Sequence, residues 1–447
     1  MLRLIHFSDI HLRSPDCDFD HTDENIHIRD LVQKDIAEFT STDGKAVDAV
    51  LITGDIAFAG KESEYQAAHR WLDSLKEALK LSNDQIFVVP GNHDVDRNKA
   101  DELLPRMIRN NIESSTQGWE REKTITEALR SDHTGAAIFA PMQKYIDFSS
   151  HYGCQISPLL PFWSKSLKLS ERVNVEFRGI TTPLFSNKND SRGSLILSRN
   201  QLNFRKLPGV VHISLMHHPC DWLVDSDEIE DIIDNNIHIQ LFGHKHRSRW
   251  KNSDNLLKVE SISLHPDRHE TSYEPGYNII DLSQTQSSDK KCTVTAKVVV
   301  RKLESNPQMF VSKPFFEHKG YFSKEITLDV LEPKSLPKLE HSSDSLETPT
   351  LEADVGSQSN CVLDEKTTGK DCNSAKQSDV NIKEASRVFG LLERSNRDKI
   401  LLECALLNQD ELAVSDVEKQ QIAFQRAIEQ GKEVLLYNAI MMKGKAL

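Results

Sequence analysis

Short apolar segments bounded by turn residues recur through roughly the first 300 residues of the chain. They fall at residues 2–8, 46–53, 85–90, 173–180, 210–219, 237–246, 256–264, 276–282 and 292–303. Runs of this length, rich in β-branched residues, are typical of strands. Residues 63–81 instead place Tyr65, Leu72 and Leu75 on one helical stripe, which predicts an amphipathic helix. Strands that alternate with helices early and follow one another late predict a two-sheet α/β sandwich with a largely parallel inner sheet.

A long helical pattern interrupts the predicted strands. Residues 97–170 contain aromatic side chains such as Trp119, Phe139 and Tyr145 at helical spacings. We expect a mostly helical insertion at this point. Two interpretations remain open: the insertion caps the polar residues that precede it, or it is a peripheral elaboration of the sandwich.

The composition changes after residue 332. Residues 333–380 are rich in Ser, Thr, Asp and Gly and contain almost no aromatic residues. Such a segment cannot bury enough apolar surface to offset the entropy lost on ordering, so we predict a disordered linker. Helical periodicity returns in residues 381–447, where Phe424, Ile428 and Leu435 share one stripe. The chain is therefore expected to comprise a domain of residues 1–332, a linker and a small helical module.

Composition and charge narrow the class of protein. The chain of 447 residues has a net charge of −13 and a pI near 5.8, which argues mildly against non-specific coating of nucleic acid. Its seven cysteines are scattered without C-x-x-C spacing, as expected for reduced thiols in a cytoplasmic protein. No apolar run approaches the roughly 18 residues of a membrane span, and the apolar start of the sequence is too short for a signal peptide. We expect no association with membranes.

Five of the predicted strands end in side chains that can bind metal ions. These are Asp9 and His11, Asp55, Asn92 with His93 and Asp94, His217 with His218, and His244 with His246. Open α/β sheets bind ligands at the carboxyl ends of their strands, so these side chains are expected to meet. One such residue alone is usually a cap or a turn residue. So many together would be costly to assemble unless cations satisfied them.

The mixture of ligand types indicates which metals are suitable. Carboxylate and amide oxygens combined with imidazoles suit manganese, iron, zinc or nickel rather than an ion that prefers thiolates. The number of candidates exceeds what one tetrahedral site needs and suits two divalent ions that share a bridging ligand. We favour manganese for both ions, with iron, zinc or nickel as alternatives.

The order D-x-H, G-D, G-N-H-D, H and G-H-x-H resembles the calcineurin-like metallophosphoesterase superfamily over roughly residues 1–285. The resemblance implies that one metal is held by Asp9, His11 and His246, the other by Asn92, His217 and His244, and that Asp55 bridges them. It also implies that His93 is a proton donor or charge stabiliser beside the scissile phosphate. The segments "GDIAFAGKESEYQ" and "MHHP" look most like class III cyclic-nucleotide and glycerophosphodiester phosphodiesterases. Val95 stands where the protein-phosphatase branch would place an arginine.

Three further residues have open roles. Asp94 either orients His93 or caps the turn, and His218 either contacts substrate or supports a metal ligand from behind. Trp222 either stacks on a base or packs structurally.

These observations predict a phosphodiesterase that hydrolyses a nucleotide or another small phosphodiester by means of a metal-bridged hydroxide. Two alternatives are a DNA or RNA nuclease with the same metals, and a metal-dependent sensor or scaffold. A homo-oligomer or a partner protein is expected to form through residues 381–447.

Overall fold

The computed structural model describes residues 1–115, 117–245, 249–252, 256–265, 274–288, 290–315, 320–330, 399–401, 404 and 436. The chain divides into two compact units, Met1–His341 and Ser342–Leu447. Nearly all of the predicted linker and helical module lies outside the described residues, so both stay predictions. None of the helices in the described ranges has the length and apolar character that crossing a membrane requires.

The first sheet has seven strands in the order β12-β11-β10-β1-β2-β3, with β13 also pairing with β11. Their bounds are β1 Leu2–Phe7, β2 Ala49–Thr53, β3 Ile86–Val89, β10 Gly276–Ser287, β11 Lys291–Ser305, β12 Gln308–Ser312 and β13 Phe322–Asp329. Strands β1, β2 and β3 are parallel, whereas β10 to β13 extend the sheet in antiparallel fashion. Strands β1, β2 and β3 are buried along their whole length, which explains why their sequences are mostly apolar.

The second sheet has six strands in the order β4-β5-β6-β7-β9-β8. Their bounds are β4 Phe162–Lys168, β5 Asn174–Ile180, β6 Val210–Leu215, β7 Ile239–Phe242, β8 Arg249–Asn252 and β9 Leu257–Glu260. Strands β5, β6, β7 and β9 are parallel, and the outer strands β4 and β8 are antiparallel to their neighbours. Both sheets therefore have a parallel centre.

The two sheets pack face to face through aromatic side chains. The ring of Phe87 on β3 lies 4.9 Å from that of Phe177 on β5 and 5.8 Å from that of Trp163 on β4, measured between centroids. The indole N–H of Trp163 donates to the carbonyl of Val88 on β3 at 2.8 Å. The predicted two-sheet α/β sandwich is thus confirmed.

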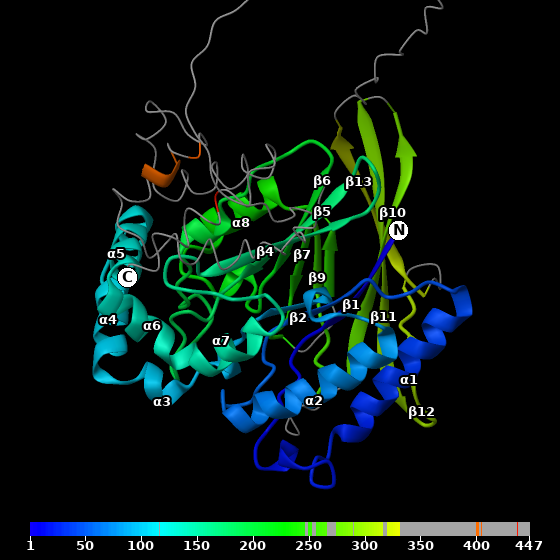
Figure 1. Cartoon of the computed structure of the whole chain (residues 1–447), viewed down its shortest axis with the longest axis horizontal. Coiled ribbons are helices and arrows are strands. Elements are labelled where there is room, and N and C mark those ends of the chain that lie inside the picture. Colours follow the sequence, from blue (N-terminus) through cyan, green and yellow to red (C-terminus); the bar gives the residue numbers. More distant parts are fainter. Residues whose placement is uncertain are drawn as a thin grey trace, which may run out of the picture. The chain divides into compact units, whose positions relative to one another are not determined.

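Two long helices follow the first two strands (Figure 1). They are α1, Ile26–Asp43, and α2, Glu62–Leu79, and they pack against each other. Helix α2 buries its predicted stripe, including Tyr65, Leu72 and Leu75. Its first turn is fixed by the buried carboxylate of Glu64, which accepts from the backbone N–H of Lys61 at 3.0 Å. Strand–helix–strand units of this kind produce the parallel pairing of β1, β2 and β3.

The predicted insertion is helical over most of its length. Five helices follow β3: α3 Arg97–Ala100, α4 Leu103–Glu113, α5 Gly118–Arg130, α6 Asp132–Phe139 and α7 Gln143–Ser150. The last part of residues 97–170 differs from the expectation, because 162–168 form the edge strand β4. This strand, "FWSKSLK", carries polar residues on its outer face, so the alternation of apolar and polar positions typical of a strand is weak in its sequence. A last helix, α8 Ser226–Asn236, connects β6 to β7.

Candidate metal centre

The candidate ligands lie beyond the carboxyl ends of β1, β2, β3, β6 and β7, so both sheets contribute to one site. They form three overlapping groups in which potential ligand atoms lie within 4.8 Å of one another. The groups are His11, Asp55 and His93; Asp9, Asp55 and His217; and His217, His218 and His244. The structure therefore brings together side chains that are up to 235 residues apart in the chain.

Asp55 lies at the centre of the cluster. Its Oδ2 atom is 3.1 Å from Nε2 of His11 and 3.2 Å from Nε2 of His217, while its Oδ1 accepts from the backbone N–H of His93 at 2.8 Å. Burial acts to raise the pKa of this carboxyl, but His217, His93 and His11 outweigh it and hold the pKa well below its usual range. Asp55 is thus a carboxylate that faces two sets of donors, as a bridging ligand must.

A backbone carbonyl orients the imidazole of His217. The Nδ1–H of this buried ring donates to the carbonyl of Thr53 at 2.7 Å, which leaves Nε2 directed at Asp55. The same Nε2 lies 3.3 Å from Nδ1 of His244. Burial acts to lower the pKa of His217, yet the charge of Asp55 and its hydrogen bond raise it to about 9.

Asn92 and His218 form a buried pair. Nε2 of His218 lies 3.0 Å from Oδ1 of Asn92, and its Nδ1 lies 2.9 Å from the hydroxyl of Thr182. Burial is the main cause of a pKa for His218 that is well below the ordinary value, so the ring is neutral. Of its two open roles, this geometry favours a residue that fixes Asn92 rather than one that contacts substrate.

Several candidate ligands occupy backbone conformations that non-glycine residues rarely adopt. The φ angles of Asp9, His11, Asp55 and His244 are 55°, 49°, 53° and 70°. Each such residue costs on the order of 1–3 kcal/mol, and strain of this kind collects at functional sites. Neighbouring glycines make the close approach feasible: a Cβ on Gly91 would lie 2.1 Å from Oδ1 of Asp55. The conformations of these loops therefore bring the candidate ligands close to Asp55.

His93 presents one nitrogen to the site. Its Nδ1–H donates to the carbonyl of Phe58 at 2.7 Å, so Nε2 is the atom that remains for chemistry. The ring lies 4.9 Å from that of His11 and 5.0 Å from that of Phe58, between centroids. Burial lowers the pKa of His93; the charge of Asp55 opposes this effect, and His11 and Arg97 reinforce it.

Asp94 holds the surrounding loops rather than His93. Its carboxylate accepts from the backbone N–H groups of Ile56, Ala57 and Gly91 at 3.2, 2.9 and 2.9 Å, and from the Tyr65 hydroxyl at 3.0 Å. Within the described part of the chain, no hydrogen bond joins it to the His93 ring, whose partner is a carbonyl. The interpretation that Asp94 orients His93 is therefore replaced by the turn-anchoring one. Burial, followed by the nearby charge of Asp55, raises the pKa of Asp94 to about 6.

The donor set fits two divalent ions. The carboxylates of Asp9 and Asp55, the amide of Asn92 and the imidazoles of His11, His217 and His244 suit manganese, iron, zinc or nickel. Oδ2 of Asp9 also accepts from the backbone N–H of His244 at 3.2 Å, which joins a strand end of the first sheet to one of the second. The last predicted ligand, His246, lies outside the described residues.

Sequence reasoning missed the groups that orient the ligands. The carbonyls of Phe58 and Thr53 and the hydroxyl of Thr182 fix the rings of His93, His217 and His218, respectively. A backbone carbonyl belongs to every residue and so leaves no signature in a sequence. Trp222 packs edge-on against His244, with 4.1 Å between ring centroids and 82° between planes. It therefore supports a ligand directly, which fits the packing interpretation.

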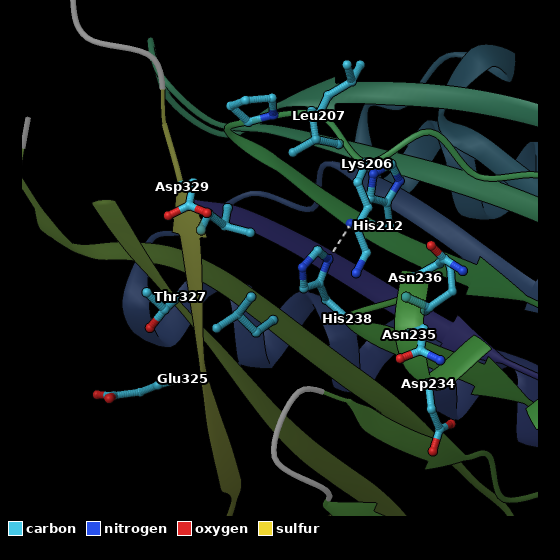
Figure 2. A pocket seen from close by; sticks show the side chains of 15 residues that line it. Lys206, Leu207, His212, Asp234, Asn235, Asn236, His238, Glu325, Thr327 and Asp329 are labelled. Atoms are coloured by element: carbon cyan, nitrogen blue, oxygen red, sulfur yellow. Dashed lines mark hydrogen bonds between the residues drawn. The ribbon is translucent and has the colours of Figure 1, made fainter. Parts of the chain in front are cut away.

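A separate cavity of about 530 Å³ lies at the other end of the second sheet, near the amino ends of β6 and β7. Figure 2 shows His212 and His238 inside it, joined by a hydrogen bond from the backbone N–H of His212 to Nδ1 of His238 at 3.0 Å. The described residues that line this cavity include none of the predicted ligands. The metal centre at the strand ends is therefore separate from this cavity.

Comparison with known proteins agrees with the geometry. Over 243 residues the chain is 27% identical to an uncharacterized metallophosphoesterase-like protein, YydB, of Bacillus subtilis (strain 168). That match covers 50% of this chain and 47% of the relative, so the chain spans about half the length of the curated relative.

Two solved structures match the chain at low similarity. A predicted phosphoesterase from Streptococcus pneumoniae TIGR4 is 13% identical with a TM-score of 0.27, covering 73% of this chain and 97% of that one. A putative 5′-nucleotidase from Staphylococcus aureus is 12% identical with a TM-score of 0.32, covering 75% and 55%.

A family profile gives the assignment. The profile described as calcineurin-like phosphoesterase matches residues 2–248, more than half of the chain. This span contains every strand end that contributes to the cluster around Asp55. The chain belongs to the calcineurin-like phosphoesterase family.

Proposed function

We propose that this protein hydrolyses a phosphodiester bond in a nucleotide or another small phosphodiester, with two divalent metal ions, preferably manganese, at the cluster around Asp55. The observation that supports it best is the position of Oδ2 of Asp55, 3.1 Å from Nε2 of His11 and 3.2 Å from Nε2 of His217. A single carboxylate oxygen that faces donors from both sheets suits a bridge between two ions.

The residues divide the chemistry among them. Bound ions would supply Lewis acidity and an activated water. Asp9 and His11, with His246 predicted in addition, would hold one ion, and Asn92, His217 and His244 the other. Asn92 provides a neutral oxygen, which limits the negative charge that faces an anionic substrate. His93 directs Nε2 at the space beside Asp55, where it can deliver a proton to the leaving oxygen.

The overall reaction balances with water as the co-substrate. The bond between phosphorus and the leaving oxygen breaks, and the water oxygen forms the new bond to phosphorus. One proton of that water is lost to solvent or to a base. The leaving oxygen receives the Nε2 proton of doubly protonated His93, and solvent then returns a proton to that nitrogen.

The preference for diesters is supported by sequence. "GDIAFAGKESEYQ" and "MHHP" look like class III phosphodiesterases, and Val95 stands where a protein phosphatase would place an arginine. A nuclease with the same metals is the competing function, and the choice of substrates below separates the two.

The test is a comparison of the Mn²⁺-loaded full chain with the EDTA-treated chain. The substrates are cyclic nucleotides, bis(p-nitrophenyl) phosphate, p-nitrophenyl phosphate and single-stranded DNA. We expect activity on the small diesters that EDTA abolishes and Mn²⁺ restores. Asp55→Ala should lose bound metal and nearly all turnover together, because this carboxylate serves both ions, whereas the exposed-site control Asp20→Ala should retain both. Unchanged diester hydrolysis by the metal-free chain would contradict the proposal, and activity confined to DNA would favour the nuclease.

We further propose a cytoplasmic location and an assembly formed through residues 381–447. Among the described residues, the cysteines at positions 17, 154, 220 and 292 are free thiols, which is consistent with a reducing compartment. The apolar stripes of residues 381–447 in the sequence support self-association or a protein partner.

A further inference from the structure

Two loops that leave the first sheet run side by side at the metal centre. The backbone N–H of Leu12 donates to the carbonyl of Ile56 at 3.0 Å, and that of Phe58 donates to the carbonyl of Leu12 at 3.0 Å. Leu12 and Ala57 form an isolated parallel bridge between them. The residue after Leu12 is therefore held next to Phe58, although the two are 45 positions apart in the chain.

A buried carboxylate fixes both loops from behind. The Glu64 side chain accepts from the backbone N–H of Ser14 at 3.2 Å, of Ala59 at 2.9 Å and of Lys61 at 3.0 Å. Glu64 itself is fully buried, so these charge-assisted bonds are protected from water. The backbone on either side of Arg13 and Phe58 is thereby anchored at the start of α2.

The anchored loops place one cation beside the reaction space. The guanidinium carbon of Arg13 lies 4.0 Å from the centre of the Phe58 ring, and the same ring lies 5.0 Å from His93 and 6.1 Å from His11. Arg13 is exposed, and among the described residues no carboxylate forms an ion pair with it. Stacking on an aromatic face orients a guanidinium and leaves its N–H edges available to an anion.

We propose that Arg13 is a specificity residue that binds a second negative charge on the substrate, located on the leaving group. This inference rests on the proposed function, because it uses His93 as the residue that protonates the leaving oxygen. Phe58 contacts His93 through its carbonyl and its ring and carries Arg13 on that ring. The Phe58 ring therefore lies between the Arg13 guanidinium and the His93 imidazole, which places the guanidinium on the side of the leaving group. The favoured substrates are phosphodiesters or phosphoanhydrides whose leaving group carries a carboxylate or a further phosphate.

The experiment uses two diesters of nearly equal shape, phenyl 4-carboxyphenyl phosphate and phenyl 4-carbamoylphenyl phosphate. Their substituted leaving groups differ in charge but little in size. The Mn²⁺-loaded full chain is assayed for release of 4-hydroxybenzoate or 4-hydroxybenzamide, and the ratio of the two kcat/KM values is compared between variants. Taking a ratio cancels the different intrinsic reactivity of the two esters.

Arg13→Gln should lower that ratio about tenfold. This loss is at the low end of the range for removing a hydrogen bond to a charged group, because Arg13 is exposed to solvent. Arg13→Lys keeps the charge but not the planar stack, and should lower it less. Arg130→Gln, at the exposed end of α5, is the matched control and should leave the ratio unchanged. An equal ratio in wild type and Arg13→Gln would overturn the role of Arg13. Failure of the wild type to hydrolyse either ester or bis(p-nitrophenyl) phosphate would instead overturn the proposed function, and this inference with it.

Discussion

At the scale of single residues, the chemistry depends on which nitrogen each imidazole presents. The Nδ1–H of His93 donates to the Phe58 carbonyl at 2.7 Å, and the Nδ1–H of His217 donates to the Thr53 carbonyl at 2.7 Å. In both cases a backbone acceptor turns Nε2 toward Asp55. The two rings nevertheless differ in use. The ring of His217 faces the carboxylate of Asp55, whereas His93 donates its backbone N–H to that carboxylate and keeps Nε2 for the substrate.

This assignment predicts the behaviour of His93→Ala. The variant should retain both metals, because His93 is not a proposed ligand, but lose on the order of 10²–10⁴ in turnover, the usual contribution of a general acid. The loss should be smaller for bis(p-nitrophenyl) phosphate than for an alkyl ester, since p-nitrophenolate leaves without a proton. Metal content and turnover on the two esters are the measurements, with the exposed His133→Ala as control. Equal losses on both esters would indicate that His93 stabilises charge and does not donate a proton.

The sequence could predict the candidate ligands but not the groups that hold them. Asp9, Asp55 and His217 were identifiable because each follows an apolar strand, and strand ends converge. Asp94 shows the limit of that reasoning. The same turn sequence accommodates an orienting carboxylate or a loop anchor, and only the three-dimensional arrangement, with backbone N–H groups from two loops reaching one carboxylate, distinguishes them.

At the scale of elements, strands that are covered on both faces were predictable from the sequence, whereas edge strands exposed on one face were not. The central strands of both sheets read as continuous apolar runs because both of their faces are covered. By contrast, β4 and β13 are buried on only one face, and their exposed positions carry Lys, Ser and Glu. Their alternation resembles that of loops or helices of similar polarity. The antiparallel additions at the sheet edges were therefore missing from the prediction, although the sandwich was not.

The amino ends of β6 and β7 provide a pH-dependent contact between elements. The His238 ring accepts from the backbone N–H of His212 at 3.0 Å and stacks on its ring. Burial, assisted by the charges of His212 and Lys206, lowers the pKa of His238 to about 4. The folded state thus disfavours the protonated ring, so its contribution to stability is complete above pH of about 6.5 and is lost as the pH falls toward 4.

His238→Asn is expected to weaken this pH dependence. The Oδ1 of asparagine can replace Nδ1 as acceptor, so stability at neutral pH should change little. Between about pH 6.5 and 4 the free energy of unfolding should fall less steeply, by at most about 1.4 kcal/mol per pH unit. Urea unfolding of the metal-free protein, followed by tryptophan fluorescence, measures the slope, with the exposed His21→Asn as control. Identical slopes for wild type and His238→Asn would mean that His238 titrates normally in the folded state.

At the scale of the whole molecule, the site and the sandwich belong to the first unit. All described candidate ligands precede residue 246, and β13 completes the first sheet by pairing with β11 along its whole length. At the end of this last strand, the backbone N–H of Gly209 donates to the backbone carbonyl of Asp329 at 2.7 Å. The backbone N–H of Val330 donates to the backbone carbonyl of Lys290 at 3.0 Å. Val330 is buried, so the strand is fastened to both sheets up to that residue.

Truncation after residue 332 would leave the candidate ligands and the strands of both sheets in place. We expect residues 1–332 to fold, bind metal and hydrolyse bis(p-nitrophenyl) phosphate at nearly the rate of the full chain. Residues 381–447 would form only about 65 residues of helical module, and modules of this size often need association to be stable. Light scattering should accordingly show a smaller assembly for residues 1–332, or purification should show the loss of a partner. If the truncated chain is folded and metal-loaded but inactive, the C-terminal residues help to build the active site, and the predicted division into a catalytic domain and a separate helical module would be wrong.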